Sequence, residues 1–213
     1  ARSEVTAGRG MLVVVSSPSG GGKGTLIRRV LKDVPGLSYS VSWTTRAPRP
    51  GELDGVNYHF VTVEEFERMR DAGGFLEWAV VHGHLYGTAL SVVEQDLAEG
   101  RDIILEIDVQ GAASVLEKIP EAVSIFILPP SFETLRARLI SRATEGQNDL
   151  ELRLRNSHDE VMQYTRFKYV IINDEVALAA RKLAAVIIAE RQLKDRQSGP
   201  IRGILDSVER SKP

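Results

Sequence analysis

Cysteine is absent from the sequence, and histidine occurs only four times in 213 residues. Without cysteine, disulfide bonds and thiol catalysis are excluded, and so few histidines leave little from which to build a transition-metal site. We therefore assign no residue as a metal ligand. The lack of cysteine also fits a cytoplasmic protein, which is the location that we expect.

Long apolar runs and a surplus of positive charge are also missing. No apolar run reaches about 18 residues and no secretory signal pattern is present, so the sequence predicts neither a membrane span nor export. The net charge of −2 argues against a general partner such as nucleic acid or a membrane surface. With 43% hydrophobic residues, the chain can bury the core of a soluble enzyme.

Buried strands and amphipathic helices alternate along most of the chain. Uninterrupted apolar runs predict strands that are buried on both faces of a parallel sheet, at residues 11–16, 102–108, 122–128 and 168–173. Besides a helix directly after Lys23, helical spacing predicts helices at residues 91–99, 111–118, 132–140, 149–164 and 176–194. This alternation predicts an α/β fold with helices covering a parallel sheet.

The alternation is interrupted between residues 38 and 88. Short alternating runs there surround one predicted helix at 63–72, which we interpret as a small lobe inserted beside the sheet. The last residues carry turn signals without a clear pattern. The predicted divisions are a disordered extension (1–10), a core (11–37 and 89–194), the inserted lobe (38–88) and an unassigned tail (195–213).

The stretch SSPSGGGKGT, residues 16–25, nearly matches the phosphate-binding loop G-x-x-x-x-G-K-[ST]. Ser17 replaces its first glycine, and Gly24 replaces the closing hydroxyl residue. The stretch follows a predicted buried strand and opens a helix, so its backbone N–H groups and Lys23 can surround a phosphate. A plain turn is the weaker alternative, because three adjacent glycines weaken an ordinary helix start. The predicted nucleotide ligands here are Ser19, Gly20, Gly21, Gly22, Lys23, Gly24 and Thr25.

Two arginines in the predicted lobe, Arg46 and Arg49, lie on a segment stiffened by prolines. Guanidinium groups on a rigid loop suit bidentate capture of a phosphate, and Tyr58 and Tyr86 can add hydroxyl donors. Such a pair alone is more often a solvated surface. Together with a phosphate-binding loop in the same chain, it indicates a second phosphate site opposite the first.

Seven motifs in order across residues 11–190 resemble guanylate kinase: SPSGGGKGT, SVSWTTRAPRPGE, DGVNYHF, FLEWA, HGHLYGT, LEIDVQG and VIIND. The resemblance implies a P-loop nucleoside monophosphate kinase fold with a parallel five-stranded core, a GMP-binding lobe and a mobile lid at about 141–150. It implies transfer of a phosphoryl group from ATP to GMP with Mg²⁺. Because Gly24 lacks a hydroxyl, we expect phosphates and water to hold most of the magnesium shell.

The resemblance also implies roles for individual residues, motif by motif. Those that resemble ligands of the GMP phosphate are Arg46, Arg49, Tyr58 and Tyr86. Those that resemble the guanine-reading groups are Ser42, Glu77, Thr88 and Asp108. On the ATP side, besides the loop residues, the residues that resemble phosphate ligands are Arg138, Arg142 and Arg153. Asn173 and Asp174 resemble a segment beside the adenine. The expected catalytic set is Lys23, Arg46, Arg49, Arg138, Arg142 and Arg153.

The chemistry of guanine explains why a carboxylate, that of Glu77, is among the guanine-reading residues. Guanine presents an N1–H and a 2-amino group side by side, and a fixed Glu77 can accept from both, whereas adenine presents a bare acceptor there. For Asp108, at the end of a strand, a helix cap is an equally good interpretation. No covalent nucleophile is required, since positioning and charge neutralisation can carry phosphoryl transfer.

Two other functions remain as alternatives. One is a catalytically inactive guanylate-kinase-like interaction module, which the intact loop, lobe arginines and lid arginines disfavour. The other is a kinase for AMP or UMP, which Glu77 and Ser42 disfavour. The sequence leaves open whether the protein is a monomer or a homo-oligomer.

Overall fold

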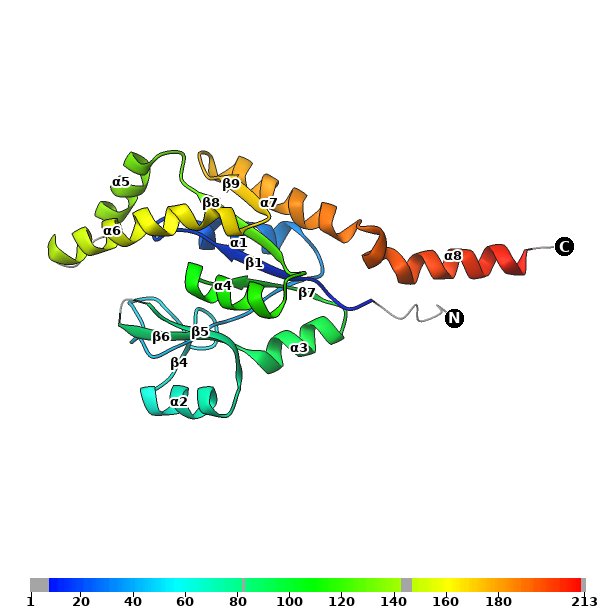
Figure 1. The fold of residues 1–213 in the computed structure, drawn as a ribbon, viewed down its shortest axis with the longest axis horizontal. Coiled ribbons are helices and arrows are strands. Elements are labelled where there is room, and N and C mark those ends of the chain that lie inside the picture. The colour runs from blue at the N-terminus through cyan, green and yellow to red at the C-terminus, as the bar shows by residue number, and fades with distance from the viewer. Residues whose placement is uncertain (1–7, 82, 143–146, 212–213) are drawn as a thin grey trace.

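A computed structural model describes the backbone of residues 8–81, 83–142 and 147–211, and their side chains except those of 142 and 147–153. The core is a five-stranded sheet in which all neighbouring strands are parallel (Figure 1). In sheet order the strands are β2 (Leu37–Tyr39), β7 (Asp102–Glu106), β1 (Leu12–Ser16), β8 (Val123–Leu128) and β9 (Tyr169–Ile172). The predicted α/β fold is confirmed, and the four predicted apolar strands agree with β1, β7, β8 and β9 to within two residues.

Helices cover both faces of this sheet because the side chains of its central strand alternate between two apolar clusters. On β1, Val13 and Val15 pack in one cluster with two helices, α1 (Lys23–Asp33) and α7 (Val176–Arg191). Leu12 and Val14 pack in the other cluster with α3 (Leu90–Ala98) and α4 (Val109–Lys118). All five residues of β1 are buried, which accounts for its uninterrupted apolar sequence. The core helices are α1 (Lys23–Asp33), α3 (Leu90–Ala98), α4 (Val109–Lys118), α5 (Phe132–Arg142), α6 (Gln147–Met162) and α7 (Val176–Arg191), with a short 3₁₀ helix η1 (Gln163–Arg166) after α6.

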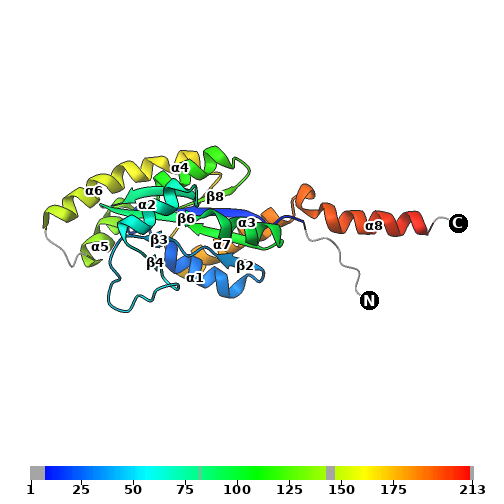
Figure 2. The same ribbon diagram turned by 90° about the horizontal axis from the view of Figure 1, so that it is seen from below.

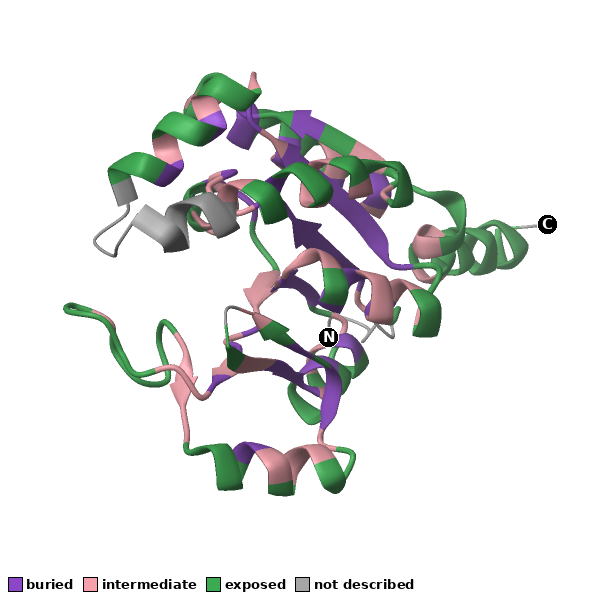
Figure 3. Cartoon of the chain, turned by 60° about the vertical axis from the view of Figure 1, so that its left-hand side comes forward, coloured by how far each residue is buried: buried purple, intermediate pink, exposed green. Residues whose placement is uncertain are grey.

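The inserted lobe contains a second, four-stranded sheet, and Figure 3 shows the two sheets as separate regions. Its strands, in sheet order, are β4 (His59–Phe60), β3 (Trp43–Thr44), β6 (His84–Ala89) and β5 (Phe75–Val81). Helix α2 (Val63–Asp71) begins with a capping box, in which Thr62 and Glu65 satisfy each other's backbone N–H groups. Phe66 of α2 is buried and stacks on Phe75 with ring centroids 4.4 Å apart, so the helix closes one face of the lobe sheet.

Two segments differ from the sequence interpretation. Strand β2 pairs with Asp102–Ile104 in the core sheet, although residues from 38 onward were assigned to the lobe. A strand of three residues is too short to show the alternation of apolar and polar residues from which a strand is predicted. The unassigned tail forms a 3₁₀ helix, η2 (Lys194–Gln197), and a helix, α8 (Ser198–Arg210), despite the turn signals of Gly199, Pro200 and Gly203. Of the predicted extension, residues 1–7 lie outside the described residues, and the N–H of Gly10 donates to the carbonyl of Leu97.

No helix in the described part of the chain is long and apolar enough to cross a membrane. The core sheet instead organises one edge of the molecule, where the carboxyl ends of β1 and β7 lie side by side. Ligands of open α/β sheets bind at this edge. The phosphate-binding loop follows β1 there, and Glu106 and Asp108 follow on β7 and its exit.

We expect Leu183→Ala to destabilise the protein by about 2–5 kcal/mol, because truncating a fully buried leucine removes apolar contacts and leaves a cavity. Leu183 is fully buried between α7, α1 and the sheet. Urea unfolding followed by circular dichroism measures the change. The matched control is Ile188→Ala on the exposed side of the same helix, which should cost far less. Equal losses at the two positions would contradict this packing.

Candidate active site

The phosphate-binding loop turns between β1 and α1 on glycines with left-handed backbone angles. Gly20 has φ 82° and Gly22, the N-cap of α1, has φ 88°, so both positions require glycine. The N–H of Gly21 donates to the carbonyl of Pro18 over 2.9 Å and closes the turn. The free N–H groups at the start of α1 therefore face the loop, as phosphate binding requires.

Asn173, at the exit of β9, holds this loop from the side. Its Nδ2 donates to the carbonyl of Gly21 over 3.0 Å, and a Cβ on Gly22 would lie only 2.6 Å from the same nitrogen. Arg138 of α5 donates from Nη2 to the carbonyl of Asn173 over 3.1 Å. The other terminal nitrogen of Arg138, Nη1, is buried and has no hydrogen-bond partner in the described part of the protein. A donor beside the loop thus remains available for an anionic ligand.

A cavity of about 470 Å³ connects the phosphate-binding loop with the lobe. Lys23 and Thr25 line it on the core side, and Arg49 and Tyr58 line it on the lobe side. Glu106, at the end of β7, also lines it, with Oε1 3.8 Å from Nζ of Lys23. Cations from the two sides therefore face one shared space, which two carboxylates also line, Glu106 on the core side and Glu52 on the lobe side.

Glu106 also explains the unusual Gly24. A Cβ at position 24 would lie 3.0 Å from Oε1 of Glu106, so a serine or threonine would crowd the carboxylate. Tyr39 donates to Glu106 over 3.2 Å, and burial, followed by the charge of Glu106, raises the pKa of this tyrosine well above its usual range. The sequence interpretation assigned no role to Glu106, although it lies within the quoted LEIDVQG motif.

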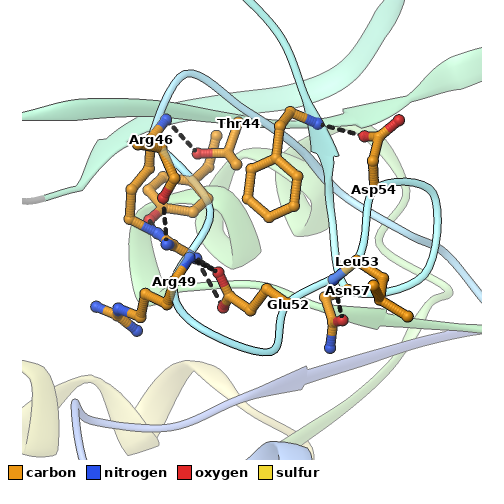
Figure 4. A network of polar contacts seen from close by, with 10 residues as sticks. Thr44, Arg46, Arg49, Glu52, Leu53, Asp54 and Asn57 are labelled. Carbon is orange, nitrogen blue, oxygen red and sulfur yellow. Dashed lines mark hydrogen bonds and ion pairs between the residues drawn. The ribbon is translucent and has the colours of Figure 1, made fainter.

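The predicted lobe arginines have different environments, as Figure 4 shows. Nη2 of Arg46 donates to both carboxylate oxygens of Glu52 over 2.9 Å, and its Nε donates to the hydroxyl of Tyr86 over 3.2 Å. Its guanidinium lies 5.4 Å from the ring centroid of Tyr58. Burial alone would lower the pKa of Arg46, but the hydrogen bonds to Glu52 and Tyr86 raise it. Arg46 is therefore held rigidly and fully charged.

Arg49 lies on the same loop with its guanidinium directed away from Glu52 (Figure 4). Its backbone N–H donates to Oε2 of Glu52 over 2.7 Å. Burial would raise the pKa of Glu52, but this bond and the charge and hydrogen bonds of Arg46 lower it. Glu52 thus fixes both arginines. Sequence reasoning missed its role, although the RPGE motif that contains it was recognised.

A second group of predicted residues meets where the lobe joins the core. Glu77 of β5 is only 4% exposed, and the hydroxyl of Thr88 on β6 donates to its Oε1 over 2.6 Å. A Cβ on Gly111 would lie 2.4 Å from Oε2 of Glu77, so glycine is needed at that position. Asp108 accepts from the N–H of Gly111 over 3.0 Å and is the N-cap of α4. The helix-cap interpretation of Asp108 is therefore confirmed, and its carboxyl group lies beside that of Glu77.

Ser42 lies next to this group. The register pairs Trp43 of β3 with Gly87 of β6, which brings the buried Ser42 beside Thr88. Glu77 and Thr88 do not line the 470 Å³ cavity. The predicted base-reading residues thus form a cluster outside the lining of this cavity, as do Arg46 and Tyr86 among the predicted phosphate ligands.

The buried carboxyl group of Glu77 has an altered acidity. Burial raises its pKa to about 7, the charge of Asp108 adds to the increase, and the hydrogen bond from Thr88 opposes it. A carboxyl group that titrates near neutrality inside a protein is a frequent mark of a functional site. Hydrogen-bond donors from a ligand would favour its charged form.

Four other positions complete the predicted set. The exposed Asp174 accepts from the N–H of Glu175 over 2.7 Å at the start of α7. The side chains of Arg142 and Arg153 lie outside the described residues. The N–H of Ser19 donates to Oε2 of Glu160 on α6 over 2.8 Å, a contact that the sequence did not suggest.

No group of three or more histidine, aspartate or glutamate side chains in the described part of the chain could hold a metal by itself. Any divalent cation in this cavity would therefore depend on the ligand's own oxygens and on water, with the carboxylates of Glu106 and Glu52 in the cavity lining.

The fold and this site define the class: an α/β protein with a P-loop between its central strand and first helix, and an inserted lobe. The family Guanylate kinase matches residues 9–190. A guanylate kinase of Caldanaerobacter subterraneus subsp. tengcongensis is 48% identical over 88% of this chain and 91% of its own, and one of Chelativorans sp. is 48% identical over 90% and 88%. The crystal structure of guanylate kinase from Anaplasma phagocytophilum superimposes with a TM-score of 0.79 at 34% identity, over 96% of this chain and 97% of that one.

The chain belongs to the guanylate kinase family. The resemblance expected from the sequence motifs is thereby confirmed.

The pKa of Glu77 predicts that the unligated protein loses stability as the pH rises from about 4.5 to about 7. In this window the unfolded chain has released the proton of Glu77 while the native state still binds it, so the free energy of unfolding falls by at most about 1.4 kcal/mol per pH unit. Urea unfolding at several pH values should show that Glu77→Gln removes this decrease. The exposed Glu94→Gln should keep the wild-type profile, and a parallel profile in Glu77→Gln would contradict the raised pKa.

Proposed function

We propose that this protein transfers the γ-phosphoryl group of ATP to GMP, giving ADP and GDP. One observation carries the proposal: the phosphate-binding loop and the lobe residues Arg49 and Tyr58 line the same cavity. The γ-phosphate of ATP and the phosphate of GMP are both anionic and must meet to react. Each therefore needs its own cationic site, and both sites must face the same cavity. The family of the chain supports the same reaction.

On the donor side, the loop N–H groups and Lys23 bind the ATP phosphates. Arg138 supports this role, because its buried Nη1 has no partner in the described structure and lies 3.9 Å from a Cβ built on Gly22. Asn173 and Asp174 lie at the adenine side. The roles of Arg142 and Arg153, as cations that close over the phosphates, rest on the family motif alone.

On the acceptor side, Arg49 binds the GMP phosphate, and Arg46 contributes the charge that Glu52 holds in position. Tyr58 and Tyr86 donate hydroxyl hydrogen bonds. Burial raises the pKa of Tyr58 to about 12, so it keeps its proton and can donate at neutral pH. The acceptor phosphate is itself anionic, so the enzyme needs to orient it in line and neutralise charge rather than supply a nucleophile.

The donor set of the cavity fits Mg²⁺, a hard cation that prefers oxygen ligands and retains several waters. Glu106 supplies a carboxylate to the cavity lining, and Gly24 leaves it space. Glu106 would hold water of the magnesium shell, while phosphate oxygens bind the ion directly. When bound, Mg²⁺ neutralises charge on the transferred group.

The base is read by the buried Glu77, Thr88 and Ser42 together with the half-buried Asp108. An ionised Glu77 accepts from N1–H and the 2-amino group of guanine, and the hydroxyl of Thr88 keeps one of its oxygens oriented. Adenine would present an acceptor to this carboxylate, which disfavours a kinase for AMP. The complete loop and arginine set disfavours an inactive interaction module, and the cytoplasm is the proposed location.

Glu77→Gln tests the base readout. The amide keeps the size of the side chain but presents one donor to the two donors of guanine, which should cost roughly 1.5–3 kcal/mol, or about ten- to more than a hundredfold in kcat/KM for GMP. IMP lacks the 2-amino group, so its kcat/KM should fall by less. A coupled ADP-release assay with GMP, IMP and AMP measures these ratios. Equal losses for GMP and IMP would assign Glu77 a structural role, and wild-type activity on AMP equal to that on GMP would overturn the substrate.

Arg49→Lys and Arg46→Lys test the phosphate clamp. An ammonium group cannot reproduce the planar guanidinium fork, so each change should lower kcat/KM for GMP by about tenfold or more. Arg46→Lys should also weaken the loop, since it loses the paired contacts to Glu52. The control is Arg68→Lys on the exposed side of α2, which should keep wild-type kinetics. Wild-type kinetics in both lobe variants would show that the two arginines are a solvated surface.

A further inference from the structure

One N–H group of the phosphate-binding loop, that of Ser19, is held from outside the cavity. Ser17 and residues 20–25 line the 470 Å³ cavity, whereas Pro18 and Ser19 do not. The N–H of Ser19 instead donates to Oε2 of Glu160 over 2.8 Å. These two residues are 141 positions apart in the sequence, so the contact joins the loop to a distant helix, α6. Ser19, predicted as a nucleotide ligand, therefore contacts a protein carboxylate in the unligated protein.

The loop needs support because its centre is intrinsically flexible. Gly20, Gly21 and Gly22 are consecutive, and glycine loses more conformational freedom on ordering than any other residue. A loop that becomes ordered only when a ligand arrives uses part of the binding free energy for its own ordering. Contacts that order the loop beforehand therefore strengthen phosphate binding without touching the phosphate.

Three contacts hold the loop from the protein side. Glu160 accepts from the N–H of Ser19, and Asn173 donates to the carbonyl of Gly21. Helix α5 packs against Gly20, since a Cβ built on this glycine would lie 3.3 Å from side-chain atoms of the helix. Only Glu160 brings a charge to the loop, and charge-assisted hydrogen bonds are about twice as strong as neutral ones. Glu160 is therefore the strongest of the three polar or packing contacts.

Helix α6 also lies against α5, which carries Arg138 (Figures 1 and 2). The ring of Phe132 on α5 meets that of His158 on α6 edge to face, with centroids 6.4 Å apart. Nη1 of Arg138 lies 3.9 Å from a Cβ built on Gly22. One pair of helices thus presents Glu160 to the outside of the loop and Arg138 to its glycines.

We propose that, in the donor-side function on which this inference rests, Glu160 is a positioning residue: it orders the phosphate-binding loop before ATP binds by holding the N–H of Ser19. Glu160 acts through the loop backbone and touches no reacting atom. Because the N–H that it binds lies outside the cavity lining, the carboxylate removes no donor from the phosphates.

Glu160→Ala tests this role through the affinity for ATP. The dissociation constant of a non-hydrolysable ATP analogue with Mg²⁺ should rise about five- to twentyfold, because the loop must then be ordered on binding. The kcat at saturating ATP should stay within about threefold of wild type, and KM for GMP should not change, whereas loss of a catalytic residue would lower kcat. Isothermal titration calorimetry and the coupled ADP-release assay measure these quantities.

Two further variants separate the hydrogen bond from the charge. Glu160→Gln keeps an acceptor oxygen at the same length, so ATP affinity should stay within about threefold of wild type. Asp159→Ala removes a carboxylate from the next position, where the side chain is 87% exposed, and should leave ATP affinity unchanged. If circular dichroism shows that Glu160→Ala is unfolded, Glu160→Met replaces it, because methionine retains the side-chain length and a high helix propensity.

Hydrogen exchange of the unligated protein gives a readout that does not depend on ATP. The amides of residues 19–25 should exchange at least about tenfold faster in Glu160→Ala than in wild type, since a local opening that lacks this contact costs less free energy. Asp159→Ala should exchange at the wild-type rate. Bound ATP analogue should remove the difference between Glu160→Ala and wild type.

Unchanged exchange of the loop, or unchanged ATP affinity, in Glu160→Ala would overturn the proposal. Equal losses of affinity in Glu160→Ala and Glu160→Gln would assign the effect to charge instead of the hydrogen bond. Tighter ATP binding in both would show that the carboxylate opposes the phosphates, which is an inhibitory contact. A wild type that does not bind ATP would reject the proposed function, and the exchange rates would still decide whether Glu160 orders the loop.

Discussion

The parallel pairing of β1 with β7 determines where the elements of the site lie. Its register sets Val15 beside Glu106, so β1 enters the phosphate-binding loop at the level where β7 ends in a carboxylate. Two residues later the exit of β7 supplies Asp108 to cap α4. The loop, Glu106 and the cluster around Glu77 thus share one edge of the sheet, because parallel strands end together. Shifting this register by one residue would turn Glu106 toward the opposite face.

Two carboxylates, the half-buried Glu52 and the buried Glu77, offset the cost of losing water contacts in different ways. Glu52 is paired with Arg46 and bonded to the N–H of Arg49, and its pKa falls. Glu77 has the hydroxyl of Thr88 and the negative Asp108 as neighbours, and its pKa rises. Glu52 therefore stabilises the lobe, whereas Glu77 is a destabilised group that further hydrogen-bond donors would stabilise in its charged form. A protein retains such a group at the expense of stability when function requires it.

The sequence predicted the features that local physics determines. Apolar runs located four core strands, and glycines marked the turns at Gly20 and Gly22, where positive φ angles are required. The roles of Glu52 and Glu106 could not be predicted, because each depends on what the fold brings beside it. Gly24 appeared as a missing hydroxyl, and only the position of Glu106 explains it. In α8, turn-forming residues concealed an amphipathic helix, whose apolar side chains are exposed.

The site and helix α8 lie at opposite ends of the core strands. Helix α7 begins near Asn173, beside the phosphate-binding loop, and ends where Arg191 pairs with Asp102, the first residue of β7. From that end η2 and α8 continue away from the molecule (Figure 2). Helix α8 therefore lies away from the cavity and the lobe. Because α7 separates α8 from the phosphate-binding loop along its whole length, a change in α8 alters no contact of that loop.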